Sequence, residues 1–215
     1  MKTSERVLIT ALELFNLQGE NNVSSVDIAM EMDISPGNLY YHFKGKEVIV
    51  AALFELHLQQ MQRILRAPAD TAMSVEDFFY FLYLLLEQIH LFRFFYRNLS
   101  DLSEKYASLA KGFKKLILAQ HQCMQTLIEQ FVELGVIKAN PHERQQMVEL
   151  IGLVFTQGPN YYAMQGQDIN DESYVYKSLA KVLFALLPYI SMPPDALHKL
   201  QGSIASESLI EQVQR

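Results

Sequence analysis

The chain has 215 residues, of which 50% are hydrophobic and 20% charged, and its formal net charge at pH 7 is −6. This length and apolar content exclude wholesale disorder and allow either one large domain or a small domain joined to a larger one. The longest apolar run, Phe78–Leu86, is too short to cross a bilayer, no secretion signal is recognised, and a single cysteine excludes an internal disulfide, so we expect a cytoplasmic protein.

The first 43 residues predict three short helices. Residues 3–17 have the spacing of an amphipathic helix. Ser24 followed by Asp27 is a capping signal for a second helix, and Asp33 stands where a tight turn requires a left-handed residue. Ser35 can cap a third helix that begins with a proline. A helix, a short turn and a second helix with polar and aromatic groups form a helix-turn-helix layout.

The rest of the chain also predicts helices. Apolar residues recur at intervals of three and four, and capping residues, glycines and prolines separate the segments. The expected helices cover about 46–66, 75–98, a short piece after 101 followed by a long helix ending at Gly135, a helix from Pro141 that ends or kinks at Gly158-Pro159, 171–187, and a short helix after Pro194 before a polar tail. No stretch alternates like a strand, so the predicted fold class is all-α.

The third predicted helix has a buried and an outward face. Leu39 and Phe43 share one side at i and i+4 and would seat the helix. Gly37 and Tyr41 then point outward, with the neighbouring polar and aromatic residues beside them. Such a helix is poorly stabilised by its own sequence, so its outer face is suited to a partner.

Charge alone does not predict a nucleic-acid-binding protein. Residues 1–47 hold four bases and seven acids, a net charge of −3 (4 − 7). The window 35–46, however, contains two lysines and a histidine and no acid. Because the local potential decides a contact within a Debye length, DNA binding by this window remains compatible with the acidic surroundings.

The N-terminal sequence resembles the DNA-binding head of TetR-family transcriptional regulators. The resemblance covers about the first 50 residues and is strongest in Leu39-Tyr40-Tyr41-His42-Phe43-Lys44 followed by Lys46-Glu47. It implies a DNA-binding domain over 1–47 and a ligand-sensing and dimerisation domain over 48–215. It also implies a homodimeric regulator, acting as a repressor, that binds a near-palindromic DNA operator and responds to a small, largely apolar ligand.

The resemblance also implies residue roles. Base edges would be met by the start of the third helix, and phosphates by its tyrosines and histidine, by hydroxyls at helix N-termini and by the lysine that opens the fourth helix. The implied DNA-binding residues are Ser24, Ser25, Ser35, Pro36, Gly37, Asn38, Tyr40, Tyr41, His42 and Lys46. Two departures from the family pattern, Asp33 in place of a turn glycine and Pro36 in place of a polar residue, leave the DNA sequence preference unreadable.

Two further sets of residues are candidates in the larger domain. Polar groups along apolar stripes are typical of ligand sites, although plain core is the common alternative. The candidate pocket residues are Tyr83, His90, Phe92, Tyr96, Gln120, His121 and Met124. The resemblance places the last two long helices in the dimer interface, with candidates Ile151, Val154, Phe155, Ala180, Leu183 and Leu187; the same residues could instead fill the core of one chain.

Catalysis and metal binding are not expected. His121 and Cys123 are two residues apart and do not share a helix face, and the six histidines lack ligand spacing. We therefore expect no enzyme, no catalytic residue, no metal and no cofactor. The alternative to a DNA-binding regulator is a helical small-molecule-binding or scaffold protein that has lost DNA binding, which the acidic head motivates.

Overall fold

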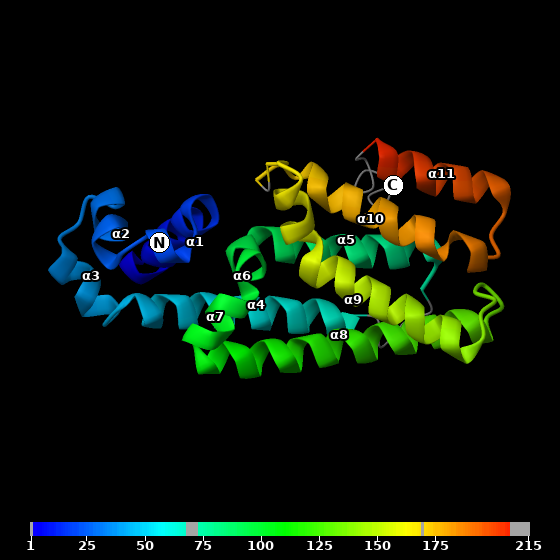
Figure 1. Ribbon diagram of the computed structural model, residues 1–215, viewed down its shortest axis with the longest axis horizontal. Coiled ribbons are helices and arrows are strands. Elements are labelled where there is room, and N and C mark those ends of the chain that lie inside the picture. The colour runs from blue at the N-terminus through cyan, green and yellow to red at the C-terminus, as the bar shows by residue number, and fades with distance from the viewer. Residues whose placement is uncertain (1, 68–72, 169, 207–215) are drawn as a thin grey trace. The chain divides into compact units, whose positions relative to one another are not determined.

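The computed structural model describes residues 2–67, 73–168 and 170–206, and within them it is helical (Figure 1). The α-helices are α1 (Thr3–Gln18), α2 (Ser25–Glu31), α3 (Pro36–His42), α4 (Lys46–Arg66), α5 (Val75–Leu91), α6 (Arg93–Arg97), α7 (Leu99–Lys105), α8 (Ala107–Glu133), α9 (Pro141–Met164), α10 (Ser173–Leu186) and α11 (Pro194–Ala205). Two short 3₁₀ helices, η1 (Glu20–Asn22) and η3 (Leu187–Tyr189), adjoin them. None of the helices among these residues is long and apolar enough to cross a membrane.

The chain divides into two compact units, the first of which contains Met1–Gln60 and Phe92–Lys114. In this unit α1, α2 and α3 pack on one another, and α6 packs against α1. The ring of Phe15 in α1 lies 5.2 Å from that of Phe94 in α6. The unit is therefore assembled from two separate stretches of sequence. The boundary at residue 47 that the resemblance implies stays a prediction.

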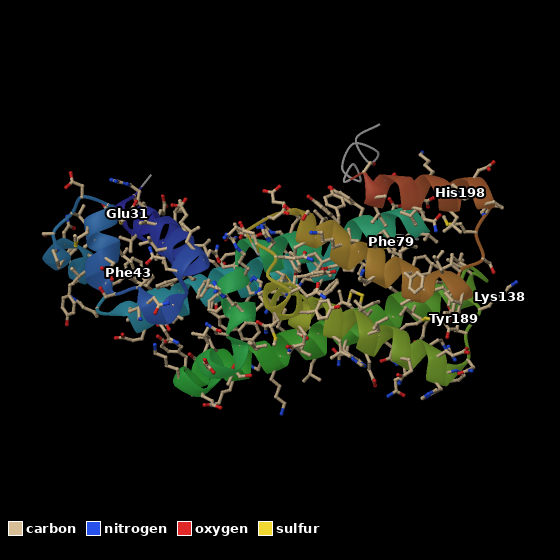
Figure 2. All side chains as sticks on the ribbon, turned by 45° about the horizontal axis from the view of Figure 1, so that its top comes forward. Glu31, Phe43, Phe79, Lys138, Tyr189 and His198 are labelled. Carbon is tan, nitrogen blue, oxygen red and sulfur yellow. The ribbon has the colours of Figure 1, made fainter. Side chains whose placement is uncertain are left out.

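The second unit contains Met61–Leu91 and Lys115–Arg215. Here α10 packs against α5, α9 and α11 (Figure 1). Phe79 of α5 is fully buried in this core. The loops after α8 and η3 are joined by backbone hydrogen bonds, one of them from Lys138 N to Tyr189 O at 2.9 Å (Figure 2).

The helix boundaries follow the predicted signals in most places. Asn140 caps α9 through the predicted box with Glu143, and Gly135 has a positive φ of 72° just after α8. One expectation was wrong, because the helix expected to reach about residue 98 ends at Leu91 and restarts as α6. Of the two outcomes expected at Gly158-Pro159, an end or a kink, the end is excluded, since α9 continues through Pro159 to Met164.

Candidate nucleic-acid interface

Local hydrogen bonds build the α2–turn–α3 segment as the sequence predicts. Ser24 Oγ accepts from Asp27 N at 3.2 Å, and Asp27 Oδ2 accepts in return from Ser24 N at 2.7 Å. Asp33 has a φ of 54°, in the left-handed region. Ser35 Oγ accepts from Asn38 N at 3.1 Å, and Pro36 occupies the first turn of α3. The predicted caps and turn are therefore confirmed.

The two faces of α3 are also as predicted. Leu39 and Phe43 are buried. On the opposite side Tyr40 is 57% exposed and Tyr41 76% exposed. The ammonium of Lys44 lies 4.8 Å from the centre of the Tyr40 ring, a cation–π contact that holds a positive charge beside the exposed tyrosines. This face presents aromatic rings, hydroxyls and a cation to solvent.

The implied DNA-binding residues differ in how accessible their side chains are to DNA. Eight of them are exposed: Ser24, Ser35, Pro36, Gly37, Asn38, Tyr40, Tyr41 and His42. Ser25 and Lys46 are half-buried. Lys46 Nζ donates to Glu20 O and Val23 O, each at 2.9 Å, and forms an ion pair with Glu20 Oε1 at 3.0 Å. An ammonium has three N–H donors, so these contacts occupy all of them.

Ser24 is exposed, but its hydroxyl is already engaged. It donates to Asp27 Oδ2 at 2.7 Å while accepting from Asp27 N. The hydrogen bonds from the Ser24 side chain and backbone hold the pKa of Asp27 below its usual value, so Asp27 is an anion at the N-terminus of α2. A phosphate at the same place would meet that negative charge.

The candidate pocket residues do not gather in one place. Phe92 and Tyr96 are buried in the first unit. In the second unit Tyr83, His90, Gln120 and Met124 are buried, whereas His121 is exposed. Gln120 Nε2 is buried without a hydrogen-bond partner among the described residues. The predicted set is thus a mixture of core and surface residues.

His57 is a buried polar residue that the sequence reasoning missed. Its Nε2 lies 2.8 Å from Tyr96 Oη, its Nδ1 has no hydrogen-bond partner within the described parts of the chain, and the Phe92 ring centre is 5.0 Å away. Burial lowers the pKa of His57 to about 3, so the ring is neutral at pH 7. Its place midway between Leu53 and Met61, four residues from each on the apolar stripe of α4, is the signal that indicates burial.

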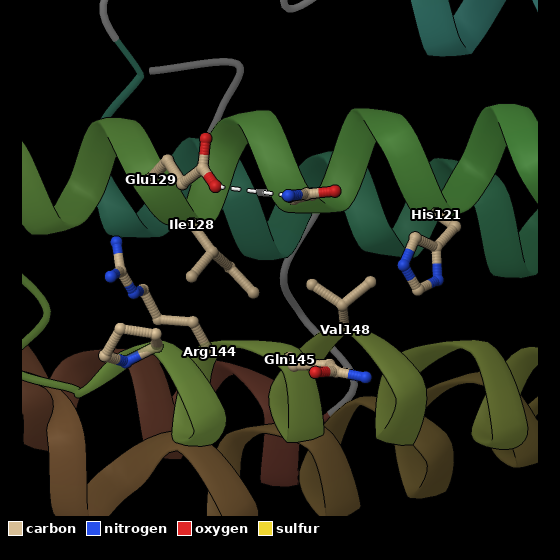
Figure 3. Close-up of a pocket in the computed structure, with 8 residues that line it drawn as sticks. His121, Ile128, Glu129, Arg144, Gln145 and Val148 are labelled. Carbon is tan, nitrogen blue, oxygen red and sulfur yellow. Dashed lines mark hydrogen bonds between the residues drawn. The ribbon is translucent and has the colours of Figure 1, made fainter.

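A groove of about 270 Å³ lies between α8 and α9 in the second unit (Figure 3). Ile128 and Val148, both buried, face one another along its floor, and His121 stands at one end (Figure 3). Glu129 and Arg144 lie at the other end. The Glu129 carboxylate accepts from Gln125 Nε2 at 3.2 Å and forms no ion pair with Arg144. The groove therefore combines an apolar floor with the half-buried guanidinium of Arg144, which forms no ion pair with the residues that the structure describes.

Three of the six interface candidates are core residues. Ile151, Phe155 and Leu183 are buried within the second unit, Val154 and Leu187 are half-buried, and Ala180 is exposed. The large exposed apolar side chains of α9 and α10 are Leu153, Tyr161, Met164 and Phe184. A second groove, of about 290 Å³, is lined by Leu153, Val154, Gly158, Tyr161, Tyr162 and Lys181. The burial of three of the six candidates shows that they fill the core of one chain, and the interface itself stays a prediction.

The geometry around Cys123 does not favour nucleophilic chemistry. Burial raises the pKa of its thiol to about 11, and Sγ lies 3.7 Å from Leu65 O. A thiol with a raised pKa is protonated at pH 7 and is a weak nucleophile.

An all-helical fold with an exposed, capped α3 defines a helix-turn-helix class of DNA-binding protein. Comparison with known families agrees. The family profile described as "Bacterial transcriptional repressor" matches residues 57–197, and the profile described as "Bacterial regulatory proteins, tetR family" matches residues 7–53. The chain belongs to the TetR family of transcriptional regulators, which is not a family of enzymes.

Individual relatives give the same result. The chain is 38% identical over 63 residues to the HTH-type transcriptional regulator UidR of Escherichia coli, covering 29% of this chain and 31% of that protein, so it matches less than a third of that relative's length. It is 19% identical over 201 residues to AcrR of Shigella flexneri, covering 89% and 94%. A crystal structure of a TetR-family regulator from Marinobacter aquaeolei matches with a TM-score of 0.83 at 26% identity, covering 96% and 98%. The ketosteroid transcriptional regulator KstR2 of Mycobacterium tuberculosis shares the fold, with a TM-score of 0.66 at 19% identity, covering 89% of this chain and 98% of that one.

Proposed function

We propose that this chain is a ligand-responsive repressor that binds a near-palindromic operator as a homodimer. The observation that carries the proposal is the outward face of α3, where Tyr40 and Tyr41 are exposed side by side although large aromatic side chains usually contribute to burial. The same face carries Lys44 and no acid. A helix of this kind fits the major groove, where aromatic, amide and hydroxyl groups meet base edges and phosphates.

The set of DNA-contacting residues in this proposal is smaller than the set that the family resemblance implies. Pro36, Gly37, Asn38 and Tyr41 would approach base edges, where glycine permits a close approach. Phosphates would be met by Tyr40, Tyr41, His42 and the hydroxyl proton of Ser35, whose oxygen is the cap of α3. Ser25 is left out because the Asp27 carboxylate lies at the same N-terminus of α2. Lys46 and the Ser24 hydroxyl are left out because their hydrogen bonds are formed within the unit.

The dimer surface in this proposal is the apolar face of α9 and α10. Met164 is 90% exposed and Phe184 75% exposed, and Leu153 and Tyr161 lie on the same two helices. The groove that Leu153 and Tyr161 line can receive an apolar side chain from a second copy. A two-fold axis would pair the same patch on both copies.

The effector in this proposal binds the groove between α8 and α9. Its apolar part would cover Ile128 and Val148, and a negatively charged end would meet the guanidinium of Arg144. The expected ligand is therefore a small apolar molecule that carries a carboxylate or a similar anion, because the groove is below the usual size of a drug-sized pocket.

Operator binding tests the proposal directly. The chain is titrated against the DNA upstream of its own gene at fixed salt, and Tyr41→Ala is expected to weaken specific binding by about tenfold or more. Leu17→Ala, which removes an equally large exposed side chain from α1, should leave binding unchanged. Equal affinity of Tyr41→Ala and the unmodified chain would remove α3 from the interface. A chain that binds no fragment specifically would favour the alternative, a helical ligand-binding or scaffold protein.

The same titration with added hexanoate tests the effector site. Hexanoate has the expected apolar part and carboxylate, so it should weaken operator binding by the unmodified chain. Arg144→Gln should bind operator normally and lose this response, because the guanidinium that meets the carboxylate is gone. The same response in both proteins, or no response in either, would contradict the assignment of this groove to a carboxylate effector.

A further inference from the structure

Glu20 is a buried carboxylate at the base of the helix-turn-helix. It lies in η1, between α1 and α2, and is 2% exposed. Its Oε1 accepts from Tyr106 Oη at 2.7 Å, and its oxygens lie 2.9 and 3.0 Å from Lys105 Nζ. Lys46 Nζ completes the cluster at 3.0 Å. All four residues belong to the first unit.

The negative charge of Glu20 is fully compensated only when Lys46, Lys105 and Tyr106 are all in contact with it. Burial alone raises the pKa of the Glu20 carboxyl, but hydrogen bonds from Lys105, Tyr106 and Lys46 bring it below its usual value. Burial and the bond to Glu20 raise the pKa of Tyr106, so its hydroxyl remains a donor. Removing Lys105 or Lys46 leaves the buried Glu20 carboxylate with only part of this compensation, which is more costly than losing an exposed ion pair.

The cluster joins parts of the chain that are distant in sequence. Lys105 is the last residue of α7 and Tyr106 stands between α7 and α8, whereas Lys46 is the first residue of α4, the helix that follows α3. A second buried polar contact runs the same way: Asn16 Oδ1 in α1 accepts from Phe94 N in α6 at 3.1 Å. Directional contacts of this kind define one arrangement of the helices more strictly than apolar packing does.

We propose that Glu20 is a positioning residue for operator binding, which fixes the helix-turn-helix on the α7–α8 junction through Lys105 and Tyr106 and on α4 through Lys46. Lys46 then acts through Glu20 and not on DNA. The inference rests on the proposed function as an operator-binding dimer. Two helix-turn-helix units can reach two half-sites only at a defined angle and spacing, so a fixed orientation of each unit favours operator binding. It also assigns a route for regulation, since α8 begins directly after Tyr106 and carries His121 of the groove on the same helix.

Two lysine variants, each of which removes one positive charge, test the proposal. Lys105→Met removes one member of the cluster, and Lys111→Met removes an exposed lysine from the same region of the first unit. We expect Lys105→Met to raise the Kd for the operator by about tenfold and Lys111→Met to change it by less than about twofold. Binding of both variants to non-specific DNA should stay equal, because the head remains folded and only its placement is lost.

A double-mutant cycle separates the cluster from general effects. Glu20→Gln keeps the shape of the side chain, and the Glu20→Gln, Lys105→Met double variant should bind operator no more weakly than Glu20→Gln alone. Equal losses in Lys105→Met and Lys111→Met, tighter operator binding by Lys105→Met, or a parallel loss of non-specific binding would overturn the proposal. If Glu20→Gln does not fold, the lysine pair alone decides. An unmodified chain that binds no operator would instead contradict the proposed function.

Discussion

His57 shows how one buried ring links sequence position, packing and proton binding. It is fully buried beside Phe92, Phe95 and Tyr96, and its one described hydrogen bond joins it to Tyr96 Oη. Burial disfavours the imidazolium and lowers the pKa of His57 to about 3. In the unfolded chain a histidine has a pKa of about 6.5, so the unfolded state binds this proton first as the pH falls.

Protonation of His57 in the unfolded state should therefore lower the free energy of unfolding as the pH decreases. The contribution is fully present above about pH 6.5 and decreases by about 1.4 kcal/mol per pH unit below it, until the folded pKa is reached. Chemical denaturation at pH 6.5 and 4.5 should show a loss about 2 kcal/mol larger in the unmodified chain than in His57→Gln, which cannot titrate. His142→Gln, which replaces an exposed histidine, should behave like the unmodified chain. Identical losses in all three proteins would mean that His57 is not buried as described.

Single-residue roles could be predicted from the sequence where local spacing decides them. Leu39 and Phe43 were placed inside and Tyr41 outside from helical periodicity alone, and the structure confirms this. Lys46 could not be treated in the same way, because its partner Glu20 is held by Lys105 and Tyr106, more than 80 residues further along the chain. No local pattern reports a contact of that separation.

Helix ends could be predicted for the same reason. The boxes at Ser24 and Asn140 use partners three residues away, so the sequence contains the whole signal. The break between α5 and α6 lacks such a signal, since the free backbone N–H of Phe94 is satisfied by Asn16 in α1. At Pro159 the sequence allowed either an end or a kink, and only the end is excluded, because α9 continues to Met164 while Pro159 is buried within the second unit.

The close packing of α4 against α8 at Gly112 predicts how a larger side chain there would affect stability. A Cβ on Gly112 would collide with the ring of Phe54 and lie 3.4 Å from Leu58 Cδ1. The ring of Phe54 is held by Phe95 and Phe113, whose centres are 5.3 and 4.7 Å away, so it cannot move aside freely. Gly112→Ala should lower the free energy of unfolding by about 1–3 kcal/mol, the usual cost of overpacking, as measured by chemical denaturation.

The matched control is a second helical glycine with open space around it. A Cβ on Gly202 of α11 meets nothing within 4 Å. Gly202→Ala should therefore raise the free energy of unfolding, by up to about 1 kcal/mol, because alanine favours the helix. Destabilisation by both substitutions to the same extent would show that the contact with Phe54 does not explain the result at Gly112.

In the proposed function, operator recognition requires two copies of the chain. Two α3 helices would have to reach major grooves about 34–36 Å apart, so the proposed dimer interface would determine which DNA can be bound. The sequence identified α9 and α10 for this role by resemblance, but it could not separate the core face from the free face because both are apolar. Phe155 and Leu183 fill the core of the second unit, whereas Met164 and Phe184 stay exposed.

Phe184→Glu should therefore separate the proposed dimer without unfolding the chain. Its side chain is exposed within one copy, but in the dimer the new carboxylate would be buried against its symmetry mate without a partner. Sedimentation equilibrium should give the monomer mass, circular dichroism should keep the helical signal, and operator affinity should fall by more than about tenfold because half-sites are bound singly. Leu118→Glu introduces the same charge at an exposed leucine of α8 and should remain dimeric. A dimer that persists in Phe184→Glu would place the interface on another surface, and the spacing of the two α3 helices would then have to be derived from that surface.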